Sequence, residues 1–386
     1  MCRLLSVGER LRPGRQMPSE PRKILVILLS EMGSLVLAIP MFERLKRQHP
    51  QAEIYALVFA RNREALECIR QIPSDHILTL RDTSLGVLVR DAVVFARAAR
   101  RLGIDTVVDA ELFSRVSSIL AYLSGAPRRV GFHPHRQEGL YRGGYINVPV
   151  LYNPYLHMAA QLVNLAEAIG GAGMPRVKTR PVAVETLEWP DPPFTEAEWR
   201  AARAALERDF PHRTGEPLVL LYPGGGLIPL RAWPADGYAE VAARLARRGC
   251  RIGVIGPASD RGLAQRVLSR CPADAALDLT GYTPALRDLI RLMASASLLI
   301  TNDGGPAHFA LLARVPTVVL FGPETPVLYR PLGPRVRVLY AGLSCSPCLT
   351  AYNHRNSPCD GDAVCLKLIA PDEVFQAALD LLAEKP

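Results

Sequence analysis

The sequence predicts an α/β protein made of two Rossmann-like, doubly wound domains that face a central cleft. Apolar strand-like runs alternate with amphipathic helical patterns along most of the chain, which is typical of parallel sheets covered by helices. The alternation occurs twice, and a proline-rich stretch at residues 173–216 interrupts it. The 386 residues suffice for two domains of ordinary size. A cleft between two such halves suits two substrates bound on opposite walls.

The first predicted domain covers residues 23–172 and follows a leader, residues 1–22, that is rich in arginine and proline and that we expect to be flexible. Short apolar runs predict strands at Lys23–Leu29, Glu53–Phe59, His76–Leu80, Thr106–Asp109 and Arg129–Phe132. Patterns with one apolar face predict helices at Leu35–His49, Asn62–Ile69, Leu85–Leu102, Ser114–Leu123 and His157–Ala168.

Residues 173–216 are predicted to be a linker that ends in one helix, Thr195–Asp209, because Thr195 and Glu198 form a capping box. The second domain, residues 217–370, has predicted strands at Leu218–Tyr222, Arg251–Ile255, Ala276–Asp278, Leu298–Ile300 and Thr317–Phe321. Its predicted helices are Ala235–Arg248, Arg261–Ser269, Thr283–Ala296 and His308–Ala313, and residues 371–386 add a last helix at Pro371–Ala383.

The composition limits the classes of function. A formal net charge of +9 favours anionic partners such as phosphates or an anionic membrane surface. Aromatic residues make up 6% of the chain, and no basic run is interleaved with them, which argues against binding of single-stranded nucleic acid, and we expect no nucleic-acid partner. The most apolar segment, residues 24–40, is broken by Glu31, Gly33 and Ser34, so we expect no transmembrane span. The leader lacks the apolar core of a signal peptide, which predicts a cytoplasmic protein with mostly reduced cysteines.

The most informative motif is residues 301–310, TNDGGPAHFA, between a predicted strand and a predicted helix. Gly304 and Gly305 permit close approach of the backbone to a ligand, and the start of the helix presents N–H groups to an anion. Asp303 and His308 flank this point and add polar groups. An ordinary strand-to-helix turn is the alternative interpretation.

Two further loops follow strands of the second domain. After the strand ending at Tyr222 come Gly224, Gly225 and then Arg231, whose planar guanidinium suits phosphate oxygens. Asp260 follows the next strand, where an acidic residue can accept hydrogen bonds from ribose hydroxyls. If each loop is considered alone, a simpler interpretation exists. The first loop would be a flexible turn with a solvated arginine, and Asp260 would be the N-cap of the following helix. Together, the three loops predict a nucleotide-diphosphate site.

Three stretches of the second half resemble the donor domain of glycosyltransferase family 9, the heptosyltransferase family of lipopolysaccharide core assembly. They are Arg231-Ala232-Trp233-Pro234, Asp303-Gly304-Gly305-Pro306-Ala307-His308 and Phe321-Gly322-Pro323-Glu324-Thr325-Pro326. The first half agrees through residues 30–40, SEMGSLVLAIP, and the resemblance covers roughly residues 23–384. It implies a GT-B fold, a nucleotide-activated heptose donor (typically ADP-heptose), inverting transfer to a lipopolysaccharide core acceptor, and no catalytic metal.

The resemblance also implies roles for single residues. Arg231 stands where the family has a phosphate-binding lysine, and Asp260 matches an acidic residue on the ribose. The diphosphate and sugar site is matched by Asp303, Gly304, Gly305 and His308.

One departure from the family concerns the catalytic base. The family usually has an aspartate directly after the glycine that corresponds to Gly33, proposed as the general base that deprotonates the acceptor hydroxyl, but this chain has Ser34. A serine hydroxyl is a poor base at neutral pH. Two alternatives remain. Glu31, three residues earlier, replaces the aspartate as general base, or Ser34 acts in a different mechanism or on a different acceptor. If Glu31 has no catalytic role, the sequence predicts a solvated loop carboxylate at this position.

A second notable feature is a cysteine-rich insert at residues 345–365. Cys345, Cys348, Cys359 and Cys365 follow the spacing Cys-x2-Cys-x10-Cys-x5-Cys, which could form a tetrahedral zinc site. The resembled family often has cysteines here without a known catalytic metal, and disulfides fit poorly with a reducing cytoplasm. Structural zinc and reduced, redox-labile thiols are the alternatives, and no cofactor is expected for catalysis.

A basic cluster in the first domain offers a possible contact for a phosphorylated glycolipid acceptor at the inner membrane surface. Its members are Arg128, Arg129, His133, His135, Arg136 and Arg142, and a solvated surface is the simpler explanation. The main hypothesis for the whole chain is heptosyl transfer by a cytoplasmic protein peripheral to that membrane. Its rivals are a transferase with another sugar or acceptor, and a nucleotide-sugar binding protein that lost turnover when Ser34 replaced the aspartate.

Overall fold

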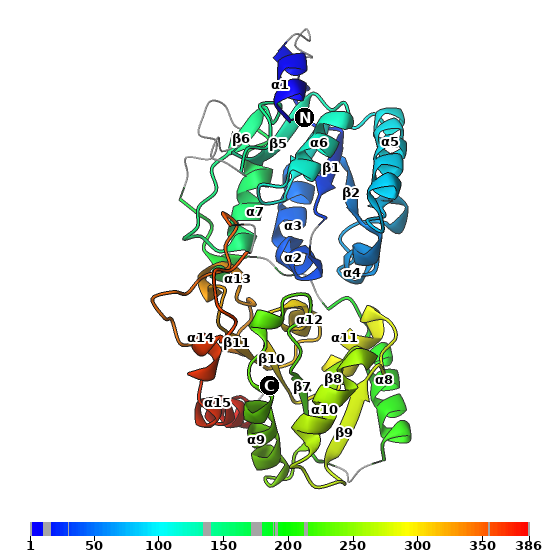
Figure 1. The fold of residues 1–386 in the computed structure, drawn as a ribbon. Coiled ribbons are helices and arrows are strands. Elements are labelled where there is room, and N and C mark those ends of the chain that lie inside the picture. The colour runs from blue at the N-terminus through cyan, green and yellow to red at the C-terminus, as the bar shows by residue number, and fades with distance from the viewer. Residues whose placement is uncertain are drawn as a thin grey trace. The chain divides into compact units, whose positions relative to one another are not determined.

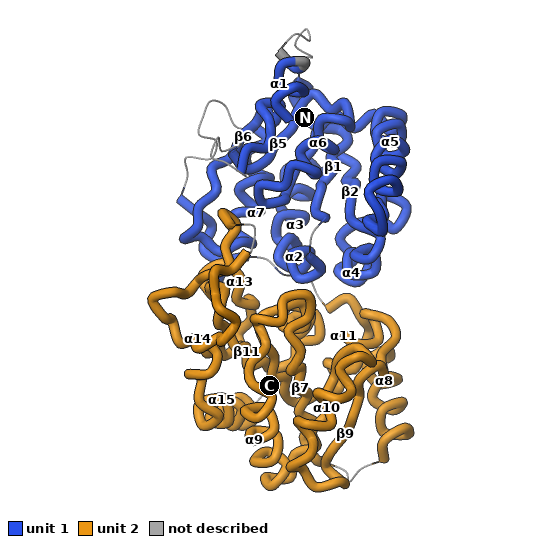
Figure 2. Tube along the Cα trace, viewed as in Figure 1, with its two compact units in different colours: residues 1–190 blue, residues 191–386 orange. Residues whose placement is uncertain are grey.

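The computed structural model describes residues 2–10, 17–29, 31–133, 140–170, 180–187, 189, 192–211, 215–353 and 356–384. The chain divides into two compact units, Met1–Pro190 and Asp191–Pro386 (Figure 2). The division falls inside the stretch that was predicted to be the linker. Helix α8, Glu196–Asp209, belongs to the second unit and has the predicted capping box at Thr195.

The first unit contains a six-stranded parallel sheet with the strand order β3-β2-β1-β4-β5-β6 (Figure 1). Its strands are β1 Lys23–Ile27, β2 Glu53–Phe59, β3 Ile77–Leu80, β4 Thr106–Asp109, β5 Arg128–Phe132 and β6 Val148–Val150. This is the strand order of a Rossmann fold. Strands β1 to β3 are added toward one edge of the sheet and β4 to β6 toward the other, so the order reverses between β1 and β4. The predicted fold class is confirmed for this half. Strand β6 was not predicted, because Pro149 interrupts its very short apolar run.

The helices of the first unit largely match the prediction. They are α1 Cys2–Arg10, α2 Met32–Leu37, α3 Ile39–Gln48, α4 Arg63–Cys68, α5 Leu85–Leu102, α6 Arg115–Leu123 and α7 Met158–Glu167. The single helix predicted at Leu35–His49 is two helices that meet at Ala38. Pro40 lies in the first turn of α3, and because it has no N–H it cannot continue the hydrogen bonds of α2.

Helix α1 lies where a flexible leader was expected. Cys2 is buried with Tyr122 and Tyr145 in a small apolar cluster. The Ser6 hydroxyl accepts a hydrogen bond from the Gly144 N–H at 2.7 Å. Residues 2–10 are therefore packed onto the first unit instead of extending freely from it.

The second unit repeats the architecture with the order β12-β11-β10-β7-β8-β9. Its strands are β7 Leu218–Tyr222, β8 Arg251–Gly256, β9 Ala276–Thr280, β10 Leu298–Asn302, β11 Thr317–Phe321 and β12 Val336–Tyr340. All are parallel, and the reversal falls between β7 and β10. Edge strand β12 was not predicted, because all its residues are only partly buried and Arg337 interrupts its apolar run.

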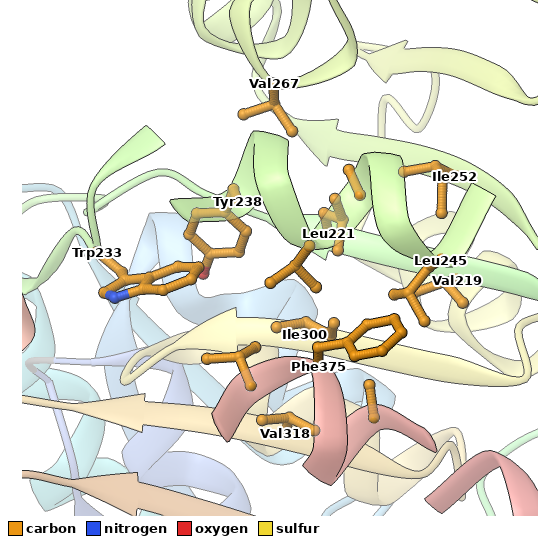
Figure 3. Packing of buried hydrophobic residues seen from close by; sticks show 14 of the residues in the cluster. Val219, Leu221, Trp233, Tyr238, Leu245, Ile252, Val267, Ile300, Val318 and Phe375 are labelled. Atoms are coloured by element: carbon orange, nitrogen blue, oxygen red, sulfur yellow. The ribbon is translucent and has the colours of Figure 1, made fainter. Parts of the chain in front are cut away.

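The remaining helices of the second unit cover this sheet. They are α9 Ala235–Ala246, α10 Arg261–Leu268, α11 Leu286–Ala294, α12 Gly305–Leu312, α13 Pro326–Tyr329, α14 Val364–Lys367 and α15 Pro371–Ala383. Figure 3 shows part of the core, in which side chains of β7, β8, β10 and β11 meet those of α9 and α15. Among the described residues, we find no helix with the length and hydropathy needed to cross a membrane.

Candidate functional site

The carboxyl ends of four neighbouring strands in the second unit carry the three charged residues predicted to bind a nucleotide, Arg231, Asp260 and Asp303, together with Glu324, which was not predicted. In the order β11, β10, β7 and β8, these ends lead into loops that contain Glu324, Asp303, Arg231 and Asp260. In open α/β sheets, ligands bind at this edge, where the strand order reverses. The reversal between β7 and β10 therefore lies beside Arg231 and Asp303.

Asn302 fixes the loop that follows β7. Its side-chain Nδ2 donates to the carbonyl oxygens of Pro223 and Gly224 at 3.0 and 3.1 Å. Its Oδ1 accepts from the Trp233 backbone N–H at 3.0 Å and from the Tyr238 hydroxyl at 3.1 Å. Asn302 is buried at the end of β10, so these bonds join the glycine-rich loop to the neighbouring strand. The sequence prediction assigned no role to this residue.

Trp233 secures the other end of the same loop. Its indole N–H donates to the Ile369 carbonyl at 3.1 Å, and its ring packs edge-on against Tyr238 with ring centroids 5.1 Å apart (Figure 3). Gly225 is required within the loop, because a Cβ there would lie 2.8 Å from the Pro229 Cα. Arg231 thus projects from a loop that is held at both ends.

Arg231 lies between two buried carboxylates. Its Nη2 is 2.8 Å from Glu324 Oε2, and its Nε is 3.5 Å from Asp303 Oδ2. All three side chains are at most 9% exposed. The alternative interpretation of this loop, a solvated arginine, is therefore wrong. The prediction also missed Glu324, although this residue lies in one of the stretches that carry the family resemblance.

Burial and charge determine the protonation of this group. Burial, opposed by Arg231 and reinforced by Asp303, raises the pKa of Glu324 to about 8. Burial also raises the pKa of Asp303, against the effect of Arg231. Burial alone would lower the pKa of Arg231, but the charges of Glu324 and Asp303 raise it. Asp303 and Glu324 interact directly, so at neutral pH these two carboxyls hold one proton between them. Their remaining negative charge balances the positive charge of Arg231, and the three groups together are nearly neutral.

Asp260 lies beside the same loop. A Cβ on Gly224 would lie 2.7 Å from Asp260 Oδ2, so the carboxylate approaches the loop backbone closely. Asp260 occupies the N-cap position of α10, but its side chain makes no capping hydrogen bond. The pKa of Tyr222 is raised by burial and then by the charge of Asp260. Tyr222, which the prediction did not assign to the site, therefore joins Gly224 and Asp260.

The glycines before α12 are not required by packing. A Cβ on Gly304 would approach only the Pro306 ring, at 3.9 Å, and one on Gly305 would be in ordinary contact with Phe309 at 3.4 Å. A helix does follow this stretch, but α12 begins at Gly305, three residues before the predicted start at His308, and His308 is buried in its first turn. The positions of Gly304 and Gly305 leave space beside the backbone at the end of β10.

Glu31, Gly33 and Ser34 lie at the corresponding place in the first unit, after β1 and beside the reversal between β1 and β4. Glu31 is the N-cap residue of α2 and is half-buried, so it is not a fully solvated loop carboxylate. Ser34 lies in the first turn of α2, and its N–H donates to the Glu31 carbonyl at 3.2 Å. Both side chains therefore belong to one turn at the carboxyl edge of this sheet.

The four cysteines of the insert differ in exposure. Cys345 and Cys359 are exposed, Cys348 is partly buried, and Cys365 is buried. Within the described residues, no group of three or more His, Cys, Asp or Glu side chains is arranged to hold a metal ion. The insert packs behind Glu324, because the N–H groups of Cys348 and Leu349 both donate to the Pro323 carbonyl at 2.9 Å.

The predicted basic cluster of the first unit does not form an exposed surface. Arg142 is fully buried and forms an ion pair with Asp109, which is also fully buried. Arg129 is buried and pairs with Glu9, and buried Arg128 donates to the Pro18 carbonyl at 2.6 Å. The interpretations as a membrane contact and as a solvated face are therefore both wrong for these arginines. His133 lies at the end of β5, and the other two members, at 135 and 136, lie outside the described residues.

Comparison with known proteins identifies related chains. A family model described as glycosyltransferase family 9 (heptosyltransferase) matches residues 95–357. Lipopolysaccharide heptosyltransferase 2 of Salmonella typhimurium is 25% identical over 368 residues, which are 94% of this chain and 99% of that protein.

Solved structures agree in fold. A structure of Escherichia coli ADP-heptose lipopolysaccharide heptosyltransferase II matches with a TM-score of 0.70 at 22% identity, covering 93% of this chain and 98% of that one. A family 9 glycosyltransferase from Veillonella parvula matches with a TM-score of 0.71 at 23% identity, covering 96% and 99%. The predicted GT-B class, with two Rossmann-like domains, is confirmed by this likeness and by the two parallel sheets.

Proposed function

Because this chain belongs to glycosyltransferase family 9, the heptosyltransferase family, we propose that it transfers heptose from ADP-heptose to a lipopolysaccharide core acceptor. The family and the enzyme class, a glycosyltransferase, are established by the match. One observation carries the choice of an anionic nucleotide donor. Arg231 is held between Asp303 and Glu324 where the strand order reverses, with Asp260 beside the next strand.

The donor diphosphate is assigned to Arg231 and to the start of α12. Neither Gly304 nor Gly305 is needed for packing, and glycine at such positions allows phosphate oxygens to approach backbone N–H groups. The two ion pairs of Arg231 use Nε and Nη2, and Nη1 takes part in neither. His308, in the first turn of the same helix, is assigned to the sugar phosphate.

The ribose is assigned to Asp260. Its carboxylate lies against the backbone of Gly224 without capping α10. Oδ1 accepts a hydrogen bond from the Ser259 hydroxyl at 3.4 Å, and Oδ2 is assigned to the vicinal hydroxyls. Tyr222, at the end of β7, borders the same place. The nucleoside and the diphosphate would then lie along the carboxyl ends of adjacent strands.

An inverting displacement places negative charge on the departing diphosphate while the sugar becomes positively charged. Fixed positive groups stabilise such a transition state because they need no rearrangement during the reaction. The pair with Glu324 holds the Arg231 guanidinium in one orientation. The proton shared by Glu324 and Asp303 keeps the site from repelling the diphosphate. We propose that this arrangement replaces a catalytic metal and that no cofactor takes part.

The acceptor is assigned to the first unit, with Glu31 as the general base. Glu31 precedes α2 at the carboxyl edge of the first sheet, which is where ligands bind in this fold. A carboxylate at this place can take the proton from an attacking hydroxyl, whereas Ser34 would need an activator of its own. The proposed place of action is the cytoplasmic face of the membrane that carries the lipopolysaccharide precursor.

The test is the release of ADP from ADP-heptose with heptose-deficient lipopolysaccharide as acceptor, for the wild type and for Glu31→Gln. We expect release that depends on the acceptor in the wild type and is lost in the variant. Donor binding without release for any heptose-deficient acceptor would contradict transfer and support a binding protein. Release with another nucleotide sugar, but not with ADP-heptose, would overturn the proposed donor.

A further inference from the structure

We propose that the exposed face of helix α5 docks on the surface of an anionic phospholipid membrane. Helix α5, Leu85–Leu102, packs beside the edge strand β3 of the first unit (Figure 1). Docking through this face would bring the transferase of the proposed function to its membrane-bound acceptor. The evidence for the docking surface itself comes from helix α5 alone.

One face of α5 is anchored in the core of the first unit. Phe95 and Ala99 are buried among side chains of the sheet, and Ala96 is buried beside them. The helix starts at Ser84, whose hydroxyl accepts a bond from the Val87 N–H, and it ends at Gly103 in the left-handed conformation. The helix is therefore fixed on the unit, and its opposite face is available for a partner.

The opposite face carries large apolar side chains. Leu85, Val89 and Val93 follow the i, i+4 spacing that places residues in one row on a helix, and they are 77%, 55% and 44% exposed. Val94, in the adjacent row, is 56% exposed. The outer face of a surface helix is normally polar, and a contiguous apolar patch indicates an interaction site.

The charge of this face indicates that its partner is anionic. Arg90, Arg97 and Arg101 are exposed. Arg97 and Arg101 continue the row of Leu85, Val89 and Val93, and Arg90 lies four residues before Val94. The acidic residue of the helix, Asp91, is already engaged by Arg81, with Nη2 at 2.8 Å from Oδ1 and Nε at 2.9 Å from Oδ2. The face therefore presents positive charge beside apolar side chains, which complements anionic headgroups above an apolar interior.

A lipid surface fits this face better than a second copy of the chain. Two copies that met through α5 would bring two positively charged faces together, and like charges at an interface are unfavourable. On a membrane, the valine and leucine side chains enter the region of the acyl chains, while the arginines reach outward to phosphate groups. A helix of 18 residues, about 27 Å long, offers a face long enough to lie in the plane of the interface.

Co-sedimentation of the full chain with phosphatidylcholine vesicles, with and without phosphatidylglycerol, tests the proposal. Neither donor nor acceptor is present, so the result does not depend on the transferase activity. Two variants address the two components of the face, Val89→Ser/Val93→Ser and Arg90→Gln/Arg97→Gln. Their matched controls are Tyr155→Ser, 87% exposed in the same unit, and Arg203→Gln, on α8 with a side chain that is 67% exposed.

We expect the wild type and both controls to bind vesicles that contain phosphatidylglycerol, and to bind less as salt is raised. The arginine variant should bind about 25-fold more weakly, from roughly fivefold per arginine, and the valine variant should also lose binding. Wild-type protein that stays in the supernatant, or α5 variants that bind as well as the wild type, would overturn the proposal. A dimer that the α5 variants dissociate, with vesicle binding unchanged, would identify the face as an interface between copies and would equally overturn it.

Discussion

The Arg231 guanidinium and the Glu324 carboxyl are in buried contact, with Nη2 2.8 Å from Oε2, although they follow strands β7 and β11 that are not neighbours in the sheet. Asp303, which follows the strand between them, completes the group at 3.5 Å from the Arg231 Nε. The arginine is consequently restrained by partners on two other loops before any ligand binds.

Arg231→Ala should lower the rate of ADP release about a hundredfold, because removal of one fixed donor to a developing oxyanion costs about 3 kcal/mol. Arg231→Lys should be milder, since it keeps the charge and loses only the planar fork. Steady-state rates with ADP-heptose and acceptor measure both effects. Arg203→Ala, an exposed arginine on α8, is the matched control and should be unaffected.

The same substitution should also destabilise the second unit. Without Arg231, Asp303 and Glu324 lie buried with no positive partner, and a broken buried pair costs about 3–5 kcal/mol. Urea unfolding separates this effect from catalysis, and the lysine variant provides a folded comparison. Full turnover in folded Arg231→Ala would refute the assignment of Arg231 to the diphosphate.

The raised pKa of Glu324 predicts that donor affinity depends on pH. Below its pKa of about 8 the carboxyl is protonated, whereas above it a second negative charge appears beside the diphosphate. ADP affinity measured by calorimetry should therefore fall about tenfold as the pH rises through that value. Glu324→Gln should remove this decrease, and Glu240→Gln, an exposed carboxyl on α9, should not. A pH profile that is identical in wild type and Glu324→Gln would contradict the prediction.

The free energy of unfolding should depend on pH because of the same proton on Glu324. Between the ordinary pKa of 4.5 and the folded value of about 8, the folded state holds a proton that the unfolded state has lost. The contribution of Glu324 to the free energy of unfolding therefore decreases as the pH rises through this window. Urea unfolding across the window should show Glu324→Gln becoming progressively more stable relative to the wild type. A difference between the two proteins that stays constant with pH would count against the raised pKa.

Glu31→Gln should lower kcat about a hundredfold or more, because a positioned general base contributes at least that factor. ADP affinity should not change, since the ADP site is assigned to the other unit. Ser34→Ala, in the same turn of α2, is the matched comparison and should retain most of the activity. The reverse pattern, with activity lost in Ser34→Ala and kept in Glu31→Gln, would transfer the role to Ser34.

Arg142→Met should destabilise the first unit by about 3–5 kcal/mol, since it leaves Asp109 as an unpaired buried charge. Replacing both partners, Arg142→Met with Asp109→Leu, should recover part of this loss because apolar pairs can substitute for buried ion pairs. Thermal or urea unfolding provides the measurement. Wild-type stability in the single variant would show that the pair is not buried as described.

Titration of thiols on the native protein should distinguish the two interpretations of the cysteine insert. We expect Cys345 and Cys359 to react rapidly because both are exposed, and Cys365 to react only after unfolding. Cys345→Ser/Cys348→Ser serves as the reference for the assignment. One zinc ion per chain, with thiols that react only after chelation and a metal that the double variant loses, would establish a structural zinc site instead.

The central elements of both sheets were predictable because their signals are local. The bounds of β2, β4, β7 and β11 agree with the prediction, since central strands of parallel sheets are continuous apolar runs bounded by turn residues. Edge strands β6 and β12 were missed, because they are short or only partly buried and lack that run. The same locality explains why α1 was mistaken for a flexible leader, since it is held by contacts with distant residues such as Tyr122 and Tyr145.

For the site, the sequence by itself determined the loops that follow β7, β8 and β10, because glycines and charged residues directly after apolar runs are visible without a structure. Only the tertiary structure decided the partners of the charged residues. It joined Arg231 to Glu324, gave Asn302 its role and buried Arg142 against Asp109. It also left the apolar face of α5 exposed. Periodicity along a chain specifies helices and strands, whereas burial and ion pairing arise when strands distant in sequence become neighbours in a sheet.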